Sequence, residues 1–425
     1  MKPKNMNILI KKGRVIDPAN GIDKRADILI KNGLIARIGK GIREKGRVIN
    51  AEGMLVTPGL IDMHTHLREP GREDEETIFS GAKAAISGGF TTICAMPNTN
   101  PCIDNKTVVR FVYDRAREVN LCNVLPIAAI TKGREGKELT DFGELIKAGA
   151  IGFSDDGNSV SDSRVMRRAL EYSKIFTKPI IVHCEDKNLS SGGVINEGYL
   201  SANLGLPGIP KQAEEIIVAR DLMLAELSDA KIHIAHISTA GSVELIRRAK
   251  KKKIRVTSET CPQYFTLTED AAKDFDTNSK VYPPLREEKD KKAIKNGLTD
   301  GTIDVIASDH APHSAEEKEK DFLAAPFGMI GLETILSLSL ALVNKQFSLT
   351  QLIAKLTVNP AKILGIDKGT LGLGKKADVT IIDPKKNWIP TTKNLKSKSK
   401  NSPFLGLKLK GKAVYTIVGG KVFSS

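Results

Sequence analysis

The sequence predicts an α/β protein in which a (β/α)8 barrel of the TIM type is joined to a small composite β domain. Three observations indicate this fold class. Between residues 54 and 309, short apolar segments alternate with helix-like ones, whereas both ends of the chain carry strand-like segments. In addition, 425 residues are more than one compact domain usually contains, so a large domain with a smaller companion is expected.

The two ends of the chain are expected to form one domain. Their strand-like segments are residues 7–17, 26–39, 370–384 and 408–423. Within the first pair, Asn32-Gly33 is a strong signal for a tight hairpin. Neither end supplies enough strands for a stable sheet of its own. We therefore expect residues 1–55 and 368–425 to pair into a composite, β-sandwich-like domain beside the barrel.

The region between the two ends predicts the barrel, which we place at residues 56–367. Its strand candidates are residues 54–64, 90–97, 123–130, 150–156, 179–185, 231–238, 255–260 and 302–309. Helix candidates lie at residues 76–88, 106–120, 141–149, 164–176, 213–227, 242–252, 333–344 and 349–365. This number of strands with intervening helices matches a (β/α)8 barrel. A doubly wound open sheet is the alternative architecture.

Composition and charge exclude several classes of protein. No run of about eighteen uncharged apolar residues could span a membrane, and the N-terminus lacks the apolar centre of a signal peptide, so we expect a cytoplasmic protein. Five cysteines without a C-x-x-C pair argue against a disulfide framework and against a thiolate zinc site. The net charge of +15 comes from scattered lysines, and the run Lys250 to Lys253 ends a predicted helix, so no nucleic-acid partner is expected.

The stretch TPGLIDMHTHLREP, residues 57–70, is the most informative part of the chain. Side chains two apart on a strand point to the same side, so His64 and His66 aim at one point while Thr65 faces away. Two neutral imidazoles that converge from a rigid strand are suited to bind a metal ion. A surface His-x-His without a metal is the alternative.

Other polar side chains end the later strand candidates: Asn98, Asp155, Asp156, His183, His236 and Asp309. Active sites of (β/α)8 barrels gather at the C-terminal ends of the strands, so we expect these side chains around one mouth. Imidazoles and carboxylates arranged there would hold one or two divalent ions. By strand parity, His233 is expected on the opposite face from His236, packed against helices, and Cys184 in the core.

Several motifs together resemble a known superfamily. They are HTHLREPG, GGFTTICAMPNTNP, FSDDG, HCED, HIAHIST, PPLR, DHAPH and the terminal GTLGLGKKADVTIID. These motifs, which span nearly the whole chain, resemble the amidohydrolase superfamily, and the pairing of HLREPG with MPNTNP resembles class I dihydroorotases. The resemblance implies a zinc-dependent cyclic amidohydrolase that interconverts N-carbamoyl-L-aspartate and (S)-dihydroorotate in de novo pyrimidine biosynthesis.

The resemblance also implies roles for individual residues. His64 and His66 would hold a first zinc ion, His183 and His236 a second, and Asp309 would be both a ligand and the proton shuttle. The residues implied to contact the substrate are His66, Arg68, Asn98, His313 and the main chain at Phe327 and Gly328. Zinc lowers the pKa of a bound water from about 15.7 to about 7, which makes a nucleophile available near neutral pH.

Two features depart from the pattern of the superfamily. Many relatives bridge two metals with a carbamylated lysine, but AGAIGFSDDG offers no lysine. We expect an aspartate there, Asp156 rather than Asp155, and a shorter carboxylate implies that the second ion is weakly held or absent. Tyr282 stands before the Pro pair, where similar dihydroorotases tend to carry Asn, which puts one substrate hydrogen bond of this position in question.

Alternatives for single residues stay open at this point. The planar fork of Arg68 suits a substrate carboxylate, but an ion pair with Glu69 or Asp74 would also explain it. Asn98 would serve the site or shape its turn, and Asp309 has an alternative as a helix N-cap.

Two other functions compete with the dihydroorotase interpretation. One is an allantoinase or hydantoinase, and the other is a non-catalytic dihydroorotase-like scaffold subunit. A homo-oligomer and association with aspartate transcarbamoylase are the expected protein partnerships.

Overall fold

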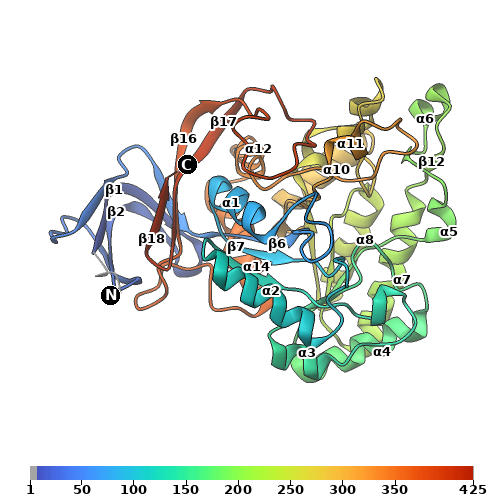
Figure 1. The fold of residues 1–425 in the computed structure, drawn as a ribbon, viewed down its shortest axis with the longest axis horizontal. Coiled ribbons are helices and arrows are strands. Elements are labelled where there is room, and N and C mark those ends of the chain that lie inside the picture. Colours follow the sequence, from blue (N-terminus) through green and yellow to red (C-terminus); the bar gives the residue numbers. More distant parts are fainter. Residues whose placement is uncertain (1–6, 425) are drawn as a thin grey trace.

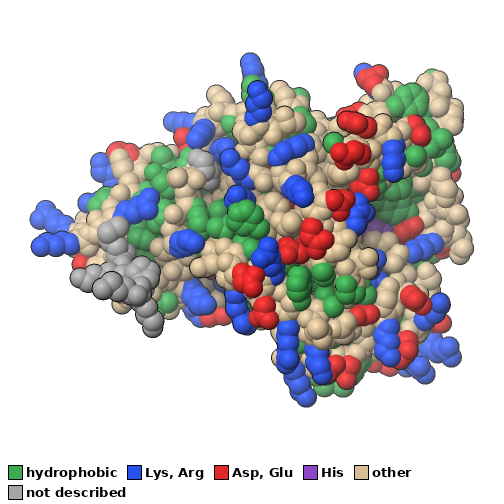
Figure 2. Space-filling view, viewed as in Figure 1, with side chains coloured by type: hydrophobic (Ala, Val, Ile, Leu, Met, Phe, Trp, Pro, Cys, Tyr) green, Lys and Arg blue, Asp and Glu red, His purple; other side chains and the backbone are tan. Residues whose placement is uncertain are grey.

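The structure, a computed structural model, describes residues 7–424 of the chain. Figure 1 shows strands from both chain ends, coloured blue and dark red, lying together at one end of the molecule beside a larger α/β part. No helix within the described residues combines the length and apolar character needed to cross a membrane. On the face shown in Figure 2, Lys and Arg side chains are dispersed and mixed with Asp and Glu.

The N- and C-terminal segments share one sheet. Its strands are β1 (Ile8–Asp17), β2 (Ile22–Lys31), β3 (Leu34–Gly39), β4 (Arg47–Asn50), β5 (Leu55–Pro58), β16 (Val379–Trp388), β17 (Leu409–Val418) and β18 (Lys421–Ser424). They pair in the order β18-β17-β16-β5-β1-β2-β3, with β4 also on β1. The two halves meet where β5 runs antiparallel to β16, with Thr57 opposite Thr380. Ile10, Val56 and Ile381 from both halves are buried in one apolar cluster.

The hairpin predicted at Asn32-Gly33 is confirmed. These residues connect the antiparallel strands β2 and β3 and have φ angles of 51° and 75°. Positive φ at both positions is what a two-residue turn of this kind requires. A side chain at Gly33 would also lie 2.5 Å from the carbonyl oxygen of Gly419, so the turn packs closely on the C-terminal segment.

The larger part contains short parallel strands. One set is β6 (Leu60–Thr65), β7 (Phe90–Ala95) and β8 (Asn123–Pro126), and the other is β9 (Phe153–Ser154), β10 (Ile180–Val182), β13 (Ile232–Ile234), β14 (Val256–Thr260) and β15 (Val305–Ile306). Isolated parallel bridges between Ala128 and Phe153, and between Thr65 and His310, join the two sets. A two-stranded pair, β11 (Ile195–Asn196) and β12 (Gly208–Ile209), lies apart.

The prediction of a single strand over residues 54–64 is wrong. The structure divides this stretch at Gly59 into β5, which belongs to the terminal sheet, and β6, which belongs to the parallel set. Pro58 and Gly59 interrupt the apolar run. The apolar residues before them belong to one sheet and those after them to the other.

Helices connect the parallel strands. The longer ones are α1 (Ile78–Gly88), α2 (Lys106–Val119), α3 (Phe142–Ala148), α4 (Ser163–Ser173), α7 (Gln212–Ser228), α8 (Ala240–Lys251), α10 (Glu288–Thr299), α13 (Leu349–Leu356) and α14 (Val358–Leu364). The shorter ones are α5 (Lys187–Ser190), α6 (Tyr199–Leu204), α9 (Pro262–Thr266), α11 (Ala315–Lys318) and α12 (Ile335–Leu340). Short 3-10 turns occupy Pro18–Asn20, Lys132–Arg134, Lys174–Phe176, Glu269–Ala272 and Thr277–Ser279.

Local sequence explains where the helices lie. In α2, the Asn105 side chain accepts hydrogen bonds from the backbone at Thr107 and Val108, which satisfies donors at the helix start. Val108, Val112 and Ala116 then recur at helical spacing and are buried. α4 and α8 show the same pattern, with Asp162 and Thr239 as their caps and buried residues at helical spacing.

Period-two alternation along the strands separates two apolar clusters. Ile180 and Ile232 join the large cluster that packs against the helices. Ile181 lies instead in a smaller cluster with Met63, Cys94 and Ala235, each from a different strand region. Each strand is therefore buried on both faces, as parallel strands between helices require, and its polar end residues point beyond the sheet.

Replacing Gly59 with Ala is expected to destabilise the junction between the two sheets. A Cβ at Gly59 would lie 2.1 Å from Oγ1 and 2.4 Å from Cγ2 of the buried Thr91. Such overpacking should lower the free energy of unfolding in urea by about 1–3 kcal/mol. Gly39→Ala is the matched control, because its Cβ would meet nothing within 4 Å. Equal effects of both substitutions would contradict this account of Gly59.

Candidate active site

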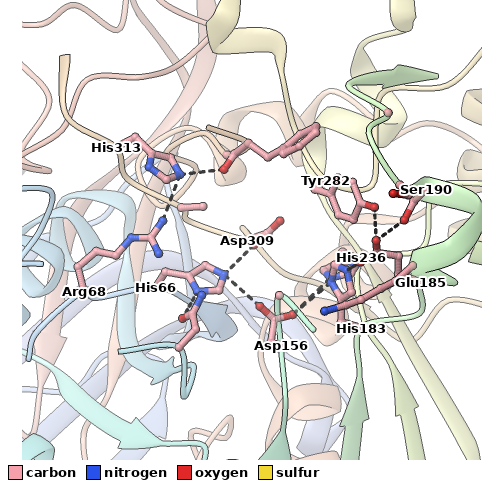
Figure 3. A pocket seen from close by; sticks show the side chains of 18 of the residues that line it. His66, Arg68, Asp156, His183, Glu185, Ser190, His236, Tyr282, Asp309 and His313 are labelled. Carbon is pink, nitrogen blue, oxygen red and sulfur yellow. Dashed lines mark hydrogen bonds and ion pairs between the residues drawn. The ribbon is translucent and has the colours of Figure 1, made fainter. Parts of the chain in front are cut away.

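A cavity of about 520 Å³ lies at the C-terminal ends of the parallel strands. The sequence-predicted residues that line it are His66, Arg68, Asn98, Asp156, His183, His236, Tyr282, Asp309, His313, Phe327 and Gly328. Figure 3 shows these side chains converging from strands and loops far apart in the sequence. His64, the remaining one of the predicted set, is fully buried beside the cavity.

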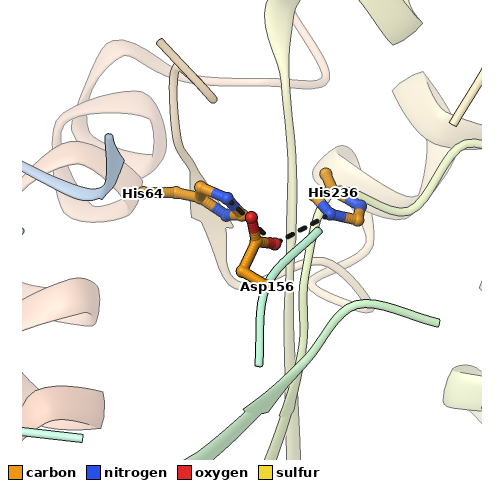
Figure 4. A group of neighbouring side chains, drawn as sticks. All are labelled: His64, Asp156 and His236. Carbon is orange, nitrogen blue, oxygen red and sulfur yellow. Dashed lines mark ion pairs between the residues drawn. The ribbon is translucent and has the colours of Figure 1, made fainter. Parts of the chain in front are cut away.

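Two overlapping clusters of imidazoles and carboxylates form the base of this cavity. His64 belongs to both, once with Asp156 and His236 and once with His66 and Asp309, and the ligand atoms of each cluster lie within 4.8 Å of one another. His64 Nε2 lies 3.3 Å from Asp156 Oδ1 and 3.5 Å from Asp309 Oδ1. Figure 4 shows Asp156 between the rings of His64 and His236.

His183 lies at the edge of the same group. Its Nδ1 is 2.9 Å from His236 Nε2 and 3.7 Å from Asp156 Oδ1. The five residues that the resemblance implied as ligands are thus gathered around Asp156, the aspartate expected in place of a carbamylated lysine. Asp155, the other candidate at this strand end, points elsewhere and accepts hydrogen bonds from the backbone of Ile130 and Thr131.

Protein acceptors orient two of the imidazoles. Glu259 Oε1 lies 2.6 Å from His64 Nδ1, and Asn98 Oδ1 lies 2.7 Å from His66 Nδ1. A carboxylate accepts only, so the neutral ring of His64 carries its proton on Nδ1 and directs Nε2 toward Asp156, where a metal ion could take the place of a second proton. Both His64 Nε2 and Asp156 Oδ1 are buried without a hydrogen-bond partner.

These residues fit a divalent metal ion. Imidazole nitrogens and carboxylate oxygens are the donors that zinc binds, and an oriented lone pair beside an unsatisfied carboxylate oxygen is what a ligand set requires. The candidate donor atoms are buried, and the second ring nitrogens of His64, His66 and His183 each contact an acceptor.

The electrostatics of the cluster also favour a cation. Burial opposes protonation of His64, but the carboxylates of Asp156, Glu259 and Asp309 raise its pKa well above the ordinary value. Burial likewise opposes ionisation of Asp156, yet His64, His183 and His236 hold its pKa far below the ordinary value. Burial also opposes protonation of His183, but Asp156 and Glu185 raise its pKa to about 9. Positive charge is therefore stabilised at this point.

Three residues of the site have left-handed backbone conformations. Arg68, His236 and Asp309 have φ angles of 60°, 32° and 47°. Non-glycine residues adopt such angles at a cost of about 1–3 kcal/mol each, and they do so mainly at functional sites where the surrounding structure enforces them. The strain lies at the ends of β6, β13 and β15, where the chain turns each side chain into the cavity.

Arg68 has a different partner from those considered on sequence alone. Its Nε lies 2.9 Å from Glu75 Oε2, whereas Glu69 pairs with Arg115 and Asp74 with Arg72. The alternative of an ion pair with Glu69 or Asp74 is therefore wrong. Arg68 Nη2 also lies 3.3 Å from His313 Nε2.

The helix-cap alternative for Asp309 is wrong as well. The helix that follows is α11, and its N-cap is Ser314, whose side chain accepts a hydrogen bond from the backbone of Glu317. Asp309 instead places Oδ1 3.1 Å from His66 Nε2. Farther along the cavity wall, His313 Nε2 lies 2.8 Å from the carbonyl oxygen of Phe327.

The prediction for His233 needs correction. Its Nδ1 lies 2.8 Å from Thr257 Oγ1 and its Nε2 3.3 Å from Glu259 Oε2, and its strand partner Ile181 belongs to the inner apolar cluster. His233 therefore faces inward rather than toward the helices, because β13 ends at Ile234 and strand parity does not extend to His236. Cys184 is buried in the core as predicted.

Three carboxylates next to the site were missed on sequence. Glu259 contacts His64, Glu185 contacts His183 at 3.2 Å, and Glu75 contacts Arg68. Period-two alternation in RVTSET places Glu259 on the same side as Thr257, and a charged residue facing inward there was a usable signal. Glu185 lies two residues after His183, so the same period-two spacing could have indicated it. Glu75 lies in an acidic run without periodicity, and no such spacing indicates it.

Comparison with known proteins agrees with this site. A family model described as dihydro-orotase-like matches residues 53–242, and one described as an amidohydrolase family matches residues 235–423. A protein named dihydroorotase from Syntrophus aciditrophicus is 53% identical over 421 residues, which cover 98% of this chain and 99% of the relative. Another, from Endomicrobium trichonymphae, is 54% identical with the same coverage of both chains.

The chain belongs to the dihydroorotase family. Among solved structures, an L-hydantoinase (dihydropyrimidinase) from Arthrobacter aurescens has a TM-score of 0.88 and is 27% identical, with coverage of 99% of this chain and 96% of that one. The α/β fold of this dihydroorotase-family chain is therefore of the amidohydrolase type.

Replacing Asp156 with Ala is expected to lower the divalent metal retained by the purified protein by at least one ion per chain. The metal-free variant also loses the contacts of this carboxylate with His64, His183 and His236, so metal content is the deciding measurement. Asp155→Ala is the matched control, and it should keep the metal but lower the free energy of unfolding by about 1–3 kcal/mol, since backbone donors lose their acceptor. Elemental analysis and urea unfolding in chelator measure both. Full metal content in Asp156→Ala would contradict the assignment.

Proposed function

We propose that this protein is a zinc-dependent dihydroorotase that interconverts N-carbamoyl-L-aspartate and (S)-dihydroorotate in de novo pyrimidine biosynthesis. The observation that carries the proposal is a ligand-like cluster and an arginine in one cavity of a chain whose full-length relatives are named dihydroorotase. A soluble small molecule with a carboxylate and a cyclic amide suits a cavity with Arg68 on one side and the cluster on the other.

We assign the metal ligands from the two overlapping clusters. His64, His66 and Asp309 would hold one zinc ion, His183 and His236 would hold a second, and Asp156 would lie between the two. A bound zinc ion polarises a carbonyl and lowers the pKa of its water to about 7. Because Asp156 is shorter than a carbamylated lysine, the second ion would be the weaker one.

Asp309 is the proposed proton shuttle. It would accept a proton from the attacking water and return that proton to the ring nitrogen that leaves. Its side chain is 11% exposed, compared with 4% for Asp156, so it reaches the cavity rather than only the cluster. In the direction of ring closure, the same carboxylate would take the proton from the carbamoyl nitrogen.

Arg68 and its neighbours would bind the substrate. Arg68 lines the cavity, and its contacts with Glu75 and His313 would orient the guanidinium before substrate arrives. We assign Asn98, His313 and the main chain at Phe327 and Gly328 to substrate binding as well, and Tyr282 lines the same cavity. Asn98 also accepts from His66, so its site role and its turn role coexist in the proposal.

We further propose that residues 56–367 form a (β/α)8 barrel and that residues 1–55 and 368–425 form the composite, β-sandwich-like domain. The bridges from Ala128 to Phe153 and from Thr65 to His310 support closure, because they link both ends of the two parallel sets. The sheet shared by the two chain ends supports the composite domain. A homo-oligomer, associated with aspartate transcarbamoylase, is the proposed assembly.

Purified protein supplied with Zn²⁺ is expected to hydrolyse dihydroorotate and to form it from carbamoyl-aspartate. Hydantoin and allantoin should react at least about tenfold less efficiently in kcat/KM, because neither carries a carboxylate for Arg68. Faster turnover of either compound would favour the hydantoinase or allantoinase alternative. A metal-loaded protein inactive both alone and with aspartate transcarbamoylase would favour the scaffold.

Arg68→Gln is expected to raise KM for dihydroorotate by about 10- to 150-fold, because the substrate carboxylate loses its charge-assisted hydrogen bonds to the guanidinium. Metal content should stay unchanged, since Arg68 is not a ligand. Arg167→Gln is the matched control, because Arg167 pairs with Glu171 on the exposed side of α4 and does not line the cavity. Steady-state kinetics with both variants measures this, and an unchanged KM in Arg68→Gln would remove Arg68 from the substrate site.

A further inference from the structure

Glu185 forms a polar bridge at the cavity wall that the proposed mechanism does not use. Its Oε2 lies 3.2 Å from His183 Nε2. Its Oε1 accepts hydrogen bonds from the hydroxyls of both Ser190 and Tyr282. Figure 3 shows this carboxylate between the two hydroxyls and the imidazole. Glu185 therefore links Tyr282 to His183 and Ser190, which lie in a distant segment of the chain.

This bridge determines which nitrogen of His183 is free. A carboxylate only accepts hydrogen bonds, so His183 carries a proton on Nε2, and its Nδ1 keeps a lone pair. That Nδ1 faces the cluster, 2.9 Å from His236 Nε2 and 3.7 Å from Asp156 Oδ1. An acceptor on the far nitrogen of a histidine ligand fixes its ring orientation and raises its basicity.

Tyr282 is held in place by its ring as well as by its hydroxyl. The ring is nearly parallel to that of His183, with an interplanar angle of 7° and centroids 5.6 Å apart. Its other neighbour is Phe327, which meets it edge-on with centroids 4.7 Å apart. With the ring confined between these two groups, the hydroxyl is directed to Glu185 rather than left free for a substrate.

We propose that Tyr282 is a positioning residue for the second metal ion: with Ser190 it holds Glu185 against His183, and so aims His183 Nδ1 at that ion. The inference rests on the two-ion centre proposed above. Tyr282 stands at the position where the family resemblance implied a hydrogen bond to substrate. In this proposal its hydroxyl instead binds another side chain of the protein, Glu185. The phenol hydroxyl donates to Glu185, so the side chain that stands before the Pro pair contacts a carboxylate of the protein.

Tyr282→Phe tests the proposal because it keeps the ring and removes only the hydroxyl. Metal-free protein is titrated with Zn²⁺ against a chromogenic chelator. Wild type is expected to bind two ions, and Tyr282→Phe should bind the first with unchanged affinity and the second about 10- to 100-fold more weakly. Tyr113→Phe is the matched control, because its hydroxyl donates to the Gly149 carbonyl at 2.8 Å, away from the cavity, and both ions should bind as in wild type.

Glu185→Gln and the double variant Tyr282→Phe/Glu185→Gln complete a cycle. If Tyr282 acts through Glu185, the double variant should bind the second ion no more weakly than Glu185→Gln alone. Ser190→Ala removes the other hydroxyl on the same oxygen and should weaken the second ion in the same direction, which keeps the test valid should Tyr282→Phe fold poorly.

Two different results would overturn the inference: one removes only the role of Tyr282, and the other removes the two-ion centre on which that role rests. Wild-type affinity for both ions in Tyr282→Phe, with only KM for dihydroorotate raised, would make Tyr282 a substrate residue. A wild-type protein that binds a single ion would instead remove the two-ion centre itself, while dihydroorotase activity would remain testable with that one ion.

Discussion

The site depends on carboxylates and imidazoles that are buried together, away from solvent. Asp156, Glu259 and His64 are almost wholly inaccessible, and Asp156 Oδ1 has no hydrogen-bond partner. Burying ionised groups costs several kcal/mol each unless opposite charge or hydrogen bonds compensate. The left-handed conformations of His236 and Asp309 show that the surrounding fold enforces the arrangement. A divalent cation is the ligand that such a cluster is built to receive.

The terminal sheet supports the strand that carries the histidine pair. The Thr380 hydroxyl on β16 donates to the Gly89 carbonyl at 2.6 Å, and Thr416 on β17 donates to the Ile86 carbonyl at 2.7 Å. These contacts reach the end of α1 and the start of β7, next to the base of β6. Because β6 leaves the terminal sheet through Gly59, with no room for a side chain, the position of His64 and His66 is coupled to strands at both chain ends.

A second layer of acceptors makes the ligands directional. Glu259 accepts from His64, Asn98 from His66 and Glu185 from His183, so each ring presents its other nitrogen to the cluster. Glu259 also faces His233, which in turn contacts Thr257, so polar contacts continue from the cluster into the interior between the strands. The lone pairs are thereby oriented by the protein before any metal binds.

The sequence by itself determined the alternation of strands and helices and the hairpin at Asn32-Gly33, because these follow from local periodicity and turn chemistry. Its motifs also pointed to the histidines and carboxylates that the structure brings together at the cavity. It did not determine the split at Gly59, the inward direction of His233 or the pairing of Arg68 with Glu75. Those features depend on where a strand ends and on which distant segment packs against it. The contacts of Glu259 with His64 and of Tyr282 with Glu185 also could not be predicted, because the partner of each side chain comes from a distant segment that only the tertiary structure brings near.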